Sequence, residues 1–511
     1  MFNKKIYYYL LIFFLGGISS FSLPPYNFFI INFFSFSLFL AILFFLKEKK
    51  VPLIHFFFIG LVFGYSFFLF SLYWISNSLK FDHNLSFLIP ITIFGLPLLL
   101  SLFYGLASLC TFFWIKNDYK VCIVFAFFLS LFEYLRSILF TGFPWNLIVY
   151  SWSGFLEQLQ ILKYIGTYTL NFLSILIFSS FFLNFIKFKI QKFLINISII
   201  LLVLLANYIF GYRSLLKKDL VHDSDFNIKI IQPNISIVDT WGLENQEKNI
   251  LKLISLSKSS ENKKTIFIWP EGMIQHSTLN GIKKYQNVFL KNFKLNDRII
   301  VGVTNPEFLN NKSIFFNSLI ILNNNADILQ VYNKINLVPF GEFIPFEDII
   351  SKYGLKKVTF GYGSFLKGDK RNSISIGNLN FLPLICYEII FSGKLNPDKE
   401  NFSFIINISE DAWFGNTIGP YQHLAHAVFR AVEEGKFIYR STNKGISAIV
   451  NDKGQILYKI PLNKEGFIES KLLPVSKNTF FSKYNNNIFY FIILLNVIFL
   501  IFFFNKKNYK I

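Results

Sequence analysis

Long apolar runs fill the first 212 residues of the chain and return at its C-terminal end. Residues 6–46 contain no charged side chain, and residues 22–27, with two consecutive prolines, are typical of a tight turn between two segments. A helix needs about 20 apolar residues to cross a bilayer. The pattern therefore predicts eight membrane spans, two within 6–46 and one each in 51–79, 84–115, 121–140, 164–186, 193–212 and 488–504.

Residues 213–487 follow a different pattern, in which short apolar runs alternate with polar turns and amphipathic stretches. Such runs predict strands where turn residues bound them, and apolar residues repeated every three to four positions predict helices. The mixture is typical of a layered α/β domain, and the segment is long enough to bury its own core. We predict strands at 226–231, 264–269, 298–303, 381–385 and 404–408, hairpins at 315–322 with 327–332 and 447–451 with 455–458, and helices at 244–258, 281–294 and 422–435.

These patterns divide the chain into three parts. We expect a transmembrane domain with seven helices over residues 1–212, an α/β domain over 213–487, and a C-terminal transmembrane helix with a short tail over 488–511. No small-residue cleavage site precedes the second apolar run, so we expect the first helix to be retained and not removed as a signal peptide.

The composition supports a membrane protein. The chain is 53% hydrophobic and only 16% charged, whereas soluble domains carry about 25% charged residues. A disordered chain, a collagen-like fibre and a disulfide scaffold are excluded by the same figures. The formal net charge of +20 indicates an excess of basic residues.

The basic residues gather in the loops on one side of the eight-span arrangement. The positive-inside rule makes that side cytoplasmic, so we expect both termini inside and the 213–487 domain on the outer face. Because these charges lie at membrane edges and no nucleic-acid-binding fold accompanies them, we expect no nucleic-acid partner. The loops are Lys4-Lys5 and residues 47–50, 116–120, 187–192 and 506–507.

Three reactive side chains follow apolar strands in the α/β segment: Glu271, Lys334 and Cys386. Cys386 is the one cysteine of that segment, so it forms no disulfide there, and it is either a buried inert thiol or a chemically used one. A thiol needs a base to become a thiolate, which a nearby carboxylate supplies, and an ammonium stabilises both thiolate and oxyanion.

Together the three residues resemble the Glu-Lys-Cys triad of the carbon-nitrogen hydrolase (nitrilase) superfamily. Their surroundings are similar to one branch of it, the bacterial apolipoprotein N-acyltransferases. The resemblance covers nearly the whole chain and rests on WPEG at 269–272, YNK at 332–334, LVPFGE at 337–342, CYE at 386–388, DAWFG at 411–415, GPYQH at 419–423, RSTNKG at 440–445, EYLR at 133–136 and TGFPW at 141–145.

The resemblance implies a polytopic helical membrane domain joined to a nitrilase-like α-β-β-α sandwich. It implies that Glu271 is a general base, that Lys334 holds an oxyanion, and that Cys386 carries an acyl group as a thioester. The acyl donor would be a membrane phospholipid and the acceptor a diacylated apolipoprotein, with no metal or soluble cofactor. Further family positions that support the triad or the substrate are Trp241, Glu342, Tyr387 and Glu388.

The residues leave several alternatives open. A membrane-anchored amidase or nitrilase would use the same triad with water as second nucleophile, whereas a non-enzymatic lipoprotein-binding protein would not need all three residues. A second carboxylate close to the thiol would raise its pKa, so we expect Glu388 to position the site and not to act as a second base. Glu410 stands where the family usually has Asn, which puts loop contacts near the substrate in doubt.

Three smaller features are interpreted from the residues alone. His423 and His426 lack a further Cys or His ligand nearby, so we favour structural hydrogen bonding over a metal site. Residues 361–363, Gly-Tyr-Gly, lack the Lys-Ser/Thr of a P-loop and are interpreted as loop punctuation. Glu133 and Arg136 share one helix face, where an ion pair is either functional or purely structural.

Overall fold

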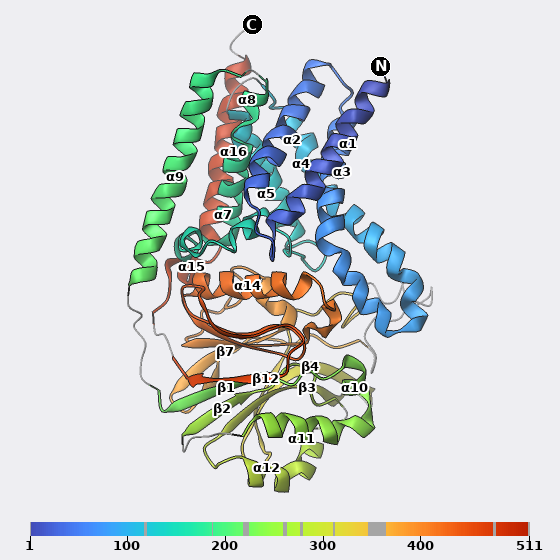
Figure 1. The fold of residues 1–511 in the computed structure, drawn as a ribbon, viewed down its shortest axis with the longest axis vertical. Coiled ribbons are helices and arrows are strands. Elements are labelled where there is room, and N and C mark those ends of the chain that lie inside the picture. The colour runs from blue at the N-terminus through green and yellow to red at the C-terminus, as the bar shows by residue number, and fades with distance from the viewer. Residues whose placement is uncertain are drawn as a thin grey trace.

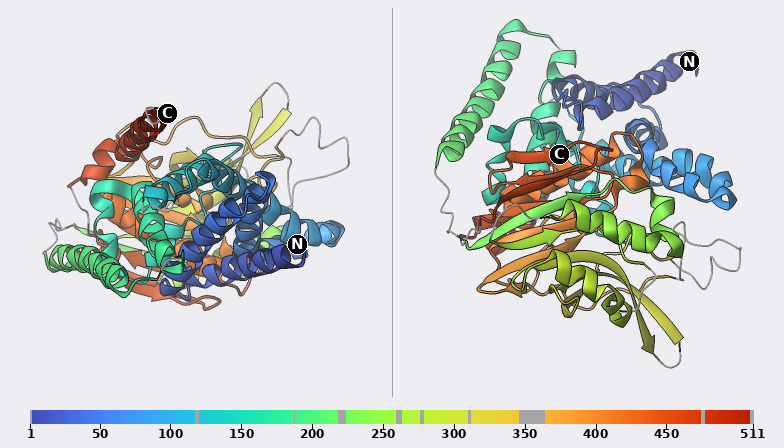
Figure 2. Two further views of the ribbon diagram at one scale, coloured as in Figure 1. Left: turned by 90° about the horizontal axis from the view of Figure 1, so that it is seen from above. Right: turned by 60° about the horizontal axis from the view of Figure 1, so that its bottom comes forward.

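The computed structural model describes residues 2–508 except 117–119, 187, 218–223, 259–262, 276–278, 310–311, 346–363 and 474–476. A bundle of helices occupies one end of the molecule and two stacked β-sheets occupy the other (Figure 1). Seen from above in Figure 2, the bundle covers the sheets and does not stand beside them.

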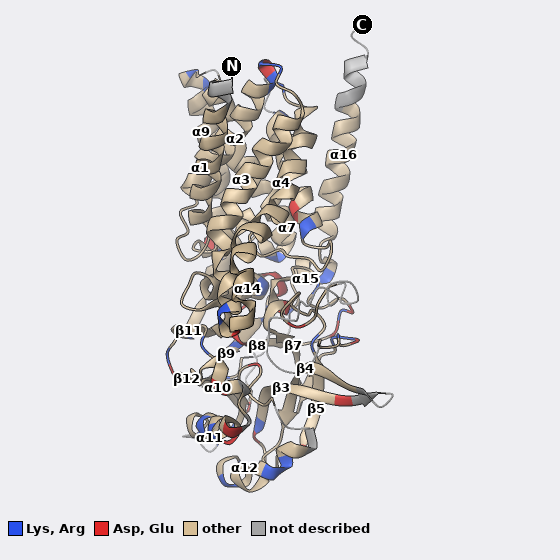
Figure 3. Cartoon of the chain, turned by 90° about the vertical axis from the view of Figure 1, so that its right-hand side faces the viewer, with Lys and Arg blue, Asp and Glu red and all other residues tan. Residues whose placement is uncertain are grey.

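The predicted apolar runs form long helices. Among the described residues, five stretches are long and apolar enough to cross a membrane: Ile30–Glu48, Ile54–Phe81, His83–Phe112, Leu162–Ile186 and Ile190–Leu216; Ile6–Ser22 and Asn487–Phe502 are shorter apolar helices. Charged residues are rare along these helices and more frequent in the sheets (Figure 3). The expected polytopic helical architecture is confirmed. The main helices are α1 (Phe2–Ser19), α2 (Ile30–Glu48), α3 (Ile54–Leu72), α4 (Leu96–Phe112), α5 (Lys120–Arg136), α7 (Leu162–Ser179), α9 (Ile190–Leu216) and α16 (Asn487–Asn508).

Twelve strands of the described residues form two six-stranded sheets. The first sheet has the order β12-β1-β2-β3-β4-β5 and the second β11-β10-β9-β8-β7-β6. The strands are β1 (Phe226–Gln232), β2 (Lys264–Ile268), β3 (Arg298–Leu309), β4 (Lys312–Leu322), β5 (Ile328–Asn333), β6 (Ile374–Ile376), β7 (Leu379–Ile385), β8 (Phe404–Ser409), β9 (Phe437–Thr442), β10 (Ser447–Val450), β11 (Ile456–Ile460) and β12 (Gly466–Lys471).

Alternate residues of the strands build two separate cores. Ile266 and Ile268 of β2 face the second sheet, whereas Phe267 between them packs against the helices on the outer face. Those helices are α11 (Gln246–Leu256) and α12 (Gln286–Asn292), and α14 (Gly419–Glu434) covers the other sheet beside the bundle (Figure 1). The layers confirm the predicted α-β-β-α sandwich.

Some predicted elements differ from the observed ones. The strand expected to end at residue 303 continues as β3 to Leu309 because its antiparallel ladder with β4 extends that far. Pro306 is tolerated there because its missing N–H is on the side away from β4, the side to which Thr304, two residues earlier, directs its amide to bond Ile274. The helix expected at 281–294 is a 3-10 segment, Leu279–Tyr285, followed by α12. β6, β9 and β12 were not predicted, and residues 361–363 lie outside the described part of the chain.

The bundle and the sandwich share one hydrophobic core. Trp145 and Tyr150, from the segment between α5 and α7, are buried in the same cluster as Leu424 and Phe429 of α14. Buried polar contacts add to it: Glu433 of α14 accepts hydrogen bonds at 2.6 Å from both the amide and the hydroxyl of Thr167 in α7. α14 is therefore packed on both of its faces, which seats the sandwich firmly against the helices.

We expect Gly302→Ala to destabilise the protein. The added Cβ would lie 2.4 Å from Glu271 Cα and 2.7 Å from Gly272 N, so the backbone between β2 and β3 must shift. Overpacking of this kind costs about 1–3 kcal/mol of the free energy of unfolding. Thermal unfolding in detergent measures the loss. Gly466→Ala is the control, because its Cβ would meet only the Ile460 side chain, at 3.9 Å; equal unfolding midpoints for both variants would contradict the argument.

Candidate active site

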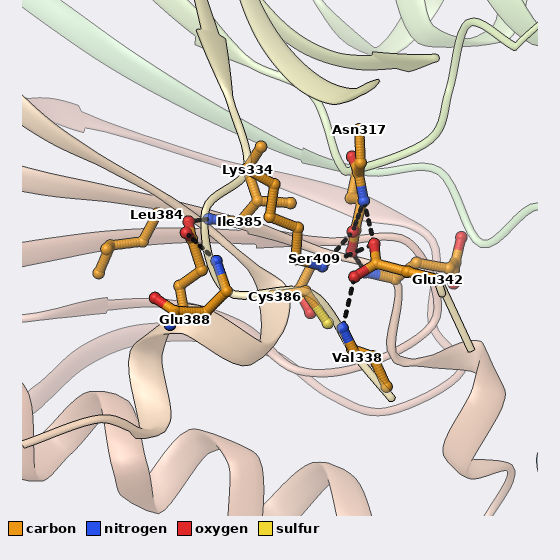
Figure 4. A network of polar contacts seen from close by, with 12 residues as sticks. Asn317, Lys334, Val338, Glu342, Leu384, Ile385, Cys386, Glu388 and Ser409 are labelled. Carbon is orange, nitrogen blue, oxygen red and sulfur yellow. Dashed lines mark hydrogen bonds and ion pairs between the residues drawn. The ribbon is translucent and has the colours of Figure 1, made fainter. Parts of the chain in front are cut away.

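The ends of three strands bring the predicted reactive residues together. Glu271 follows β2, Lys334 follows β5, and Cys386 follows β7, so two sheets contribute to one site. Lys334 Nζ lies 3.2 Å from Glu271 Oε1. Cys386 interacts electrostatically with both side chains, and Figure 4 shows its sulfur beside the Lys334 network.

Lys334 is a fully buried ammonium held between two carboxylates. Its Nζ lies 2.9 Å from Glu342 Oε1 in addition to the contact with Glu271, and only 1% of its side chain is exposed. Burial by itself lowers the pKa of Lys334, but the charges of Glu271 and Glu342 outweigh it and hold the pKa well above its ordinary value. Lys334 therefore stays positively charged across the physiological pH range.

Asn317 is a site residue that the sequence analysis missed. Its Nδ2 donates to Glu271 Oε1 at 2.7 Å and to Glu342 Oε1 at 2.5 Å (Figure 4). Asn317 lies within the apolar strand β4, and its carbonyl accepts a hydrogen bond from the Lys334 amide. The sequence signal that could have identified Asn317 is a polar residue in the middle of an apolar strand. The amide keeps the two carboxylate oxygens facing the same ammonium.

The second oxygen of each carboxylate is also fixed. Glu271 Oε2 accepts from the backbone amide of Glu410 at 2.8 Å, and Glu342 Oε2 accepts from that of Val338 at 2.8 Å. Burial raises the pKa of Glu410 to about 8, and the charge of Glu271 adds to the shift. Glu410 is therefore mostly protonated at neutral pH, so it adds little negative charge where the family usually has Asn.

Cys386 opens the 3-10 turn Cys386–Ile390 and has a positive φ of 49°, a conformation that a non-glycine residue adopts only when its surroundings impose it. Burial raises the pKa of its thiol well above the ordinary value, the charge of Glu271 raises it further, and Lys334 opposes both. The resting side chain is therefore a thiol, and Glu271 and Lys334 are charged groups of the site that act on it in opposite directions.

Glu388 ties the Lys334 and Cys386 loops to each other. Its carboxylate accepts from the amides of Ile335 at 2.9 Å and Ile385 at 2.8 Å, and pairs with Arg371 at 2.6 Å. Burial opposes its charge, but Arg371 and the two amides lower its pKa overall. Both carboxylate oxygens are thus engaged by donors that hold the loops, which fits a positioning role and not proton transfer. Arg371 was not anticipated from the sequence.

The remaining predicted residues lie at the edges of the site. Tyr387 is buried, and its hydroxyl donates to the carbonyl of Gly142 at 2.7 Å, which joins the residue after Cys386 to the loop that follows α5. Trp241 ends the short helix α10 (Ile237–Trp241), and its side chain lies outside the described part of the structure.

The rings of His423 and His426 both pack on Trp145, but the two do not share a group of metal-ligating side chains among the described residues. His423 contacts Asp411 at 2.9 Å, whereas the His426 ring packs on Trp145 and Tyr150. The group of described residues with spacing suited to a metal is instead Cys386, Asp411 and His423, whose ligand atoms lie within 4.8 Å of one another. The positively charged guanidinium of Arg440 already lies against this group: its Nη2 is 2.7 Å from Asp411 and 3.0 Å from His423 Nδ1.

Glu133 and Arg136 are buried in α5, with 3.9 Å between Arg136 Nη2 and Glu133 Oε1. Glu133 also accepts hydrogen bonds from Tyr104 at 2.7 Å and Asn171 at 2.6 Å. Arg136 donates to the carbonyl of Phe143, in the same loop that contacts Tyr387. The pair therefore has a structural role in holding this loop.

Comparisons with known proteins cover both parts of the chain. The family model described as apolipoprotein N-acyltransferase N-terminal domain matches residues 15–180, and that described as carbon-nitrogen hydrolase matches residues 230–473. An apolipoprotein N-acyltransferase of Rhizobium leguminosarum bv. trifolii is 31% identical over 479 residues, which cover 89% of this chain and 88% of that protein. One of Rickettsia bellii is 33% identical over 436 residues, with 83% and 85% covered. A solved CN-hydrolase superfamily protein of Xanthomonas campestris has a TM-score of 0.34 and 14% identity, covering 49% of this chain and 91% of that chain.

We expect Glu271→Gln to lower the pKa of the Cys386 thiol. The substitution removes a negative charge that raises this pKa and leaves Lys334 beside the sulfur. The midpoint of iodoacetamide alkylation against pH should fall by about one unit or more, the size of shift that an adjacent charge causes. Cys110 and Cys122 are replaced by Ser in both proteins so that only Cys386 reports. An unchanged or higher midpoint would show that Glu271 does not act on the sulfur.

We expect Glu388→Gln to destabilise the protein by about 3–5 kcal/mol, because it leaves the buried Arg371 unpaired. The pKa of Glu388 is lower in the folded state than in the unfolded state. Its contribution is therefore complete above the unfolded carboxyl pKa of about 4.3 and is lost as pH falls through the folded pKa. Unfolding midpoints measured at several pH values should therefore fall less on acidification in the variant than in the wild type. Glu465→Gln, which breaks the exposed pair with Lys252 at 2.7 Å, is the control with little expected effect.

Proposed function

The chain belongs to the apolipoprotein N-acyltransferase family, and we propose that it transfers a fatty acyl group from a membrane phospholipid to the N-terminal amino group of diacylglyceryl-cysteine in apolipoproteins. This reaction would be the last step of lipoprotein maturation. The observation that carries the proposal is the buried cluster in which a cysteine, a carboxylate and an ammonium meet at the junction of the sandwich with apolar helices.

In the first half of the reaction, Glu271 takes the proton of the Cys386 thiol and the sulfur attacks the ester carbonyl of the phospholipid. The carbonyl oxygen becomes an oxyanion, which Lys334 Nζ and the backbone amide of Tyr387 stabilise. When the tetrahedral intermediate collapses, the C–O ester bond breaks and the lysophospholipid oxygen takes the proton from Glu271. The acyl group remains on Cys386 as a thioester.

In the second half, the α-amino group of the apolipoprotein attacks the thioester carbonyl. Glu271 accepts a proton from the amine, and the same oxyanion donors act again. The C–S bond then breaks, an amide forms, and the Cys386 sulfur recovers its proton from Glu271. Glu271 thus serves as base and acid in turn, and fixed hydrogen bonds to both of its oxygens hold it in place for the two steps.

The supporting residues act on this pair of steps without taking part in bond changes. Glu342 holds the Lys334 ammonium, and Glu388 holds the two loops that carry Lys334 and Cys386. Tyr387 and Trp241 would contribute to the substrate pocket, as their family positions imply. The chemistry needs no metal or soluble cofactor, because the base and the oxyanion donors are all side chains and backbone.

We place the protein in the bacterial inner membrane as a multi-pass enzyme, with the 213–487 domain on the periplasmic side and both termini in the cytoplasm. The boundaries 1–212, 213–487 and 488–511 belong to the same proposal. The lysine-rich loops support this orientation through the positive-inside rule. A lipid-anchored donor and a lipid-anchored acceptor both require a site close to the membrane surface.

A membrane-anchored amidase or nitrilase is less supported. Such an enzyme would share the triad but would have no need of the N-terminal region, which matches the acyltransferase family over residues 15–180. The two functions differ in what releases the acyl group: water for the hydrolase, and the amine of a lipid-modified peptide for the transferase.

Membranes that contain Cys386→Ser should accumulate diacylated lipoproteins with free N-termini, whereas the wild type should yield the triacylated form. The reason is that a serine hydroxyl is a far weaker nucleophile than a thiolate in this site. Mass spectrometry of lipoprotein N-terminal peptides measures the ratio of the two forms.

Cys110→Ser in α4 is the matched control, because that thiol lies outside the sandwich and should leave the ratio unchanged. Identical N-terminal peptides from the wild type and the Cys386 variant would overturn the proposed function.

A further inference from the structure

A buried polar network lies beneath the nucleophile and has no part in the steps above. The His423 ring is fully buried in α14, and its Nε2 lies 3.3 Å from the backbone carbonyl oxygen of Cys386. A carbonyl oxygen can only accept a hydrogen bond, so this hydrogen bond uses the tautomer with the proton on Nε2. The ring therefore forms its hydrogen bond with the main chain of Cys386 and not with its sulfur.

The rest of the network fixes the ring in this orientation. Arg440 Nη2 lies 3.0 Å from His423 Nδ1 and 2.7 Å from Asp411 Oδ2, and Asp411 Oδ1 lies 2.9 Å from the same ring nitrogen. Ser409 adds a hydrogen bond to Asp411 at 2.7 Å. Burial and the Arg440 charge lower the pKa of His423, which favours a neutral ring. With the proton on Nε2, Nδ1 accepts from Arg440; its 2.9 Å approach to Asp411 Oδ1 is then no hydrogen bond, and Asp411 accepts from Arg440 and Ser409 instead.

Because the peptide bond is planar, this contact also fixes the direction of the next amide, that of Tyr387. In a planar trans peptide, the carbonyl of one residue and the amide N–H of the next point in opposite directions. A carbonyl of Cys386 that is held toward His423 thus turns the Tyr387 N–H to the opposite side. Tyr387 also lies in the first turn of a 3-10 helix, Cys386–Ile390, where N–H groups have no intrahelical acceptor.

The backbone at Cys386 would not hold this orientation unaided. Its φ of 49° is unfavourable for a residue with a Cβ, so the surrounding contacts must hold it there. His423 is one such contact, and Glu388 holds the backbone on the other side, one peptide further back, through the amide of Ile385 at 2.8 Å. The two residues hold the backbone before and after the nucleophile.

We propose that His423 is a positioning residue for the acyl-transfer reaction: through its hydrogen bond to the Cys386 carbonyl, it aims the Tyr387 amide at the oxyanion of the tetrahedral intermediate. The inference rests on the proposed function, because it concerns the oxyanion formed there. His423 exchanges no proton with substrate, and its hydrogen bond goes to the Cys386 carbonyl although the ring lies within 4.8 Å of the sulfur. Its effect is confined to steps that form an oxyanion.

Two substitutions separate this role from a merely structural one. His423→Asn keeps an amide near the Nδ1 position, close to Asp411 and Arg440, but is too short to reach the Cys386 carbonyl. His423→Gln extends an amide nitrogen to about the place of Nε2 and keeps that hydrogen bond. His426→Asn is the matched control, since it removes an equally buried histidine of the same helix that contacts Trp145 and Tyr150 instead of Cys386.

Two rates are measured on each purified full-length protein, in a background where Cys110 and Cys122 are Ser. The first is thioester formation on Cys386 from dipalmitoyl phosphatidylethanolamine in mixed detergent micelles, followed by mass spectrometry. The second is alkylation of Cys386 by iodoacetamide. Alkylation displaces iodide at a saturated carbon and forms no oxyanion, so it reports the thiol without the oxyanion donors.

His423→Asn should slow thioester formation about tenfold or more while alkylation changes less than about threefold, since loss of an oxyanion donor costs up to about 10²–10³ in rate. His423→Gln should restore thioester formation, and His426→Asn should leave the ratio of the two rates at the wild-type value. Should the Asn variant fail to fold, the Gln variant decides: wild-type alkylation with lost thioester formation would overturn the inference.

Equal slowing of both rates in His423→Asn, or no slowing of either, would also overturn it. The proposed function fails by a different result, namely no thioester on wild-type Cys386. A wild type that forms the thioester beside an equally active His423→Asn refutes the positioning role alone.

Discussion

The active site is organised around one buried positive charge. Lys334 is almost completely enclosed, and burying an unpaired ammonium would be costly unless carboxylates accompany it. The carboxylates of Glu271 and Glu342 provide the compensating negative charge, at 3.2 and 2.9 Å from the ammonium, and Asn317 holds both of them in place. The carboxylate that we propose as the base for the cysteine is thus also a partner that the lysine needs, so stability and the proposed chemistry depend on the same contacts.

A second constraint follows from the place of the site near the junction of the sandwich with the helical bundle. α14 packs its apolar residues against the helical bundle and carries His423 beneath the nucleophile, while Tyr387 reaches the Gly142 carbonyl of the loop after α5. The residues on either side of the reacting sulfur are therefore held by elements that also contact the bundle. These contacts keep the reactive groups in a fixed position relative to the helical bundle.

The sequence predicted the architecture well where a pattern was local. Apolar runs without charges became long helices, and Glu271, Lys334 and Cys386 each ended an apolar strand as expected. It was less successful where pairing overrides local signals. β3 passes through Pro306 because its partner β4 continues, and β9 was missed because a fully buried strand next to a helix has no alternation to reveal it.

The sequence by itself determined which segments are apolar, which residues are reactive, and that each reactive residue follows a strand. Only the tertiary structure decided that Asn317 bridges two carboxylates and that Arg371 neutralises Glu388. It also decided that His423 forms a hydrogen bond with the main chain of Cys386. The physical reason is that these partners come from separate strands and helices, and a hydrogen bond at about 3 Å depends on how two sheets and a helix stack. Sequence spacing contains no measure of that distance.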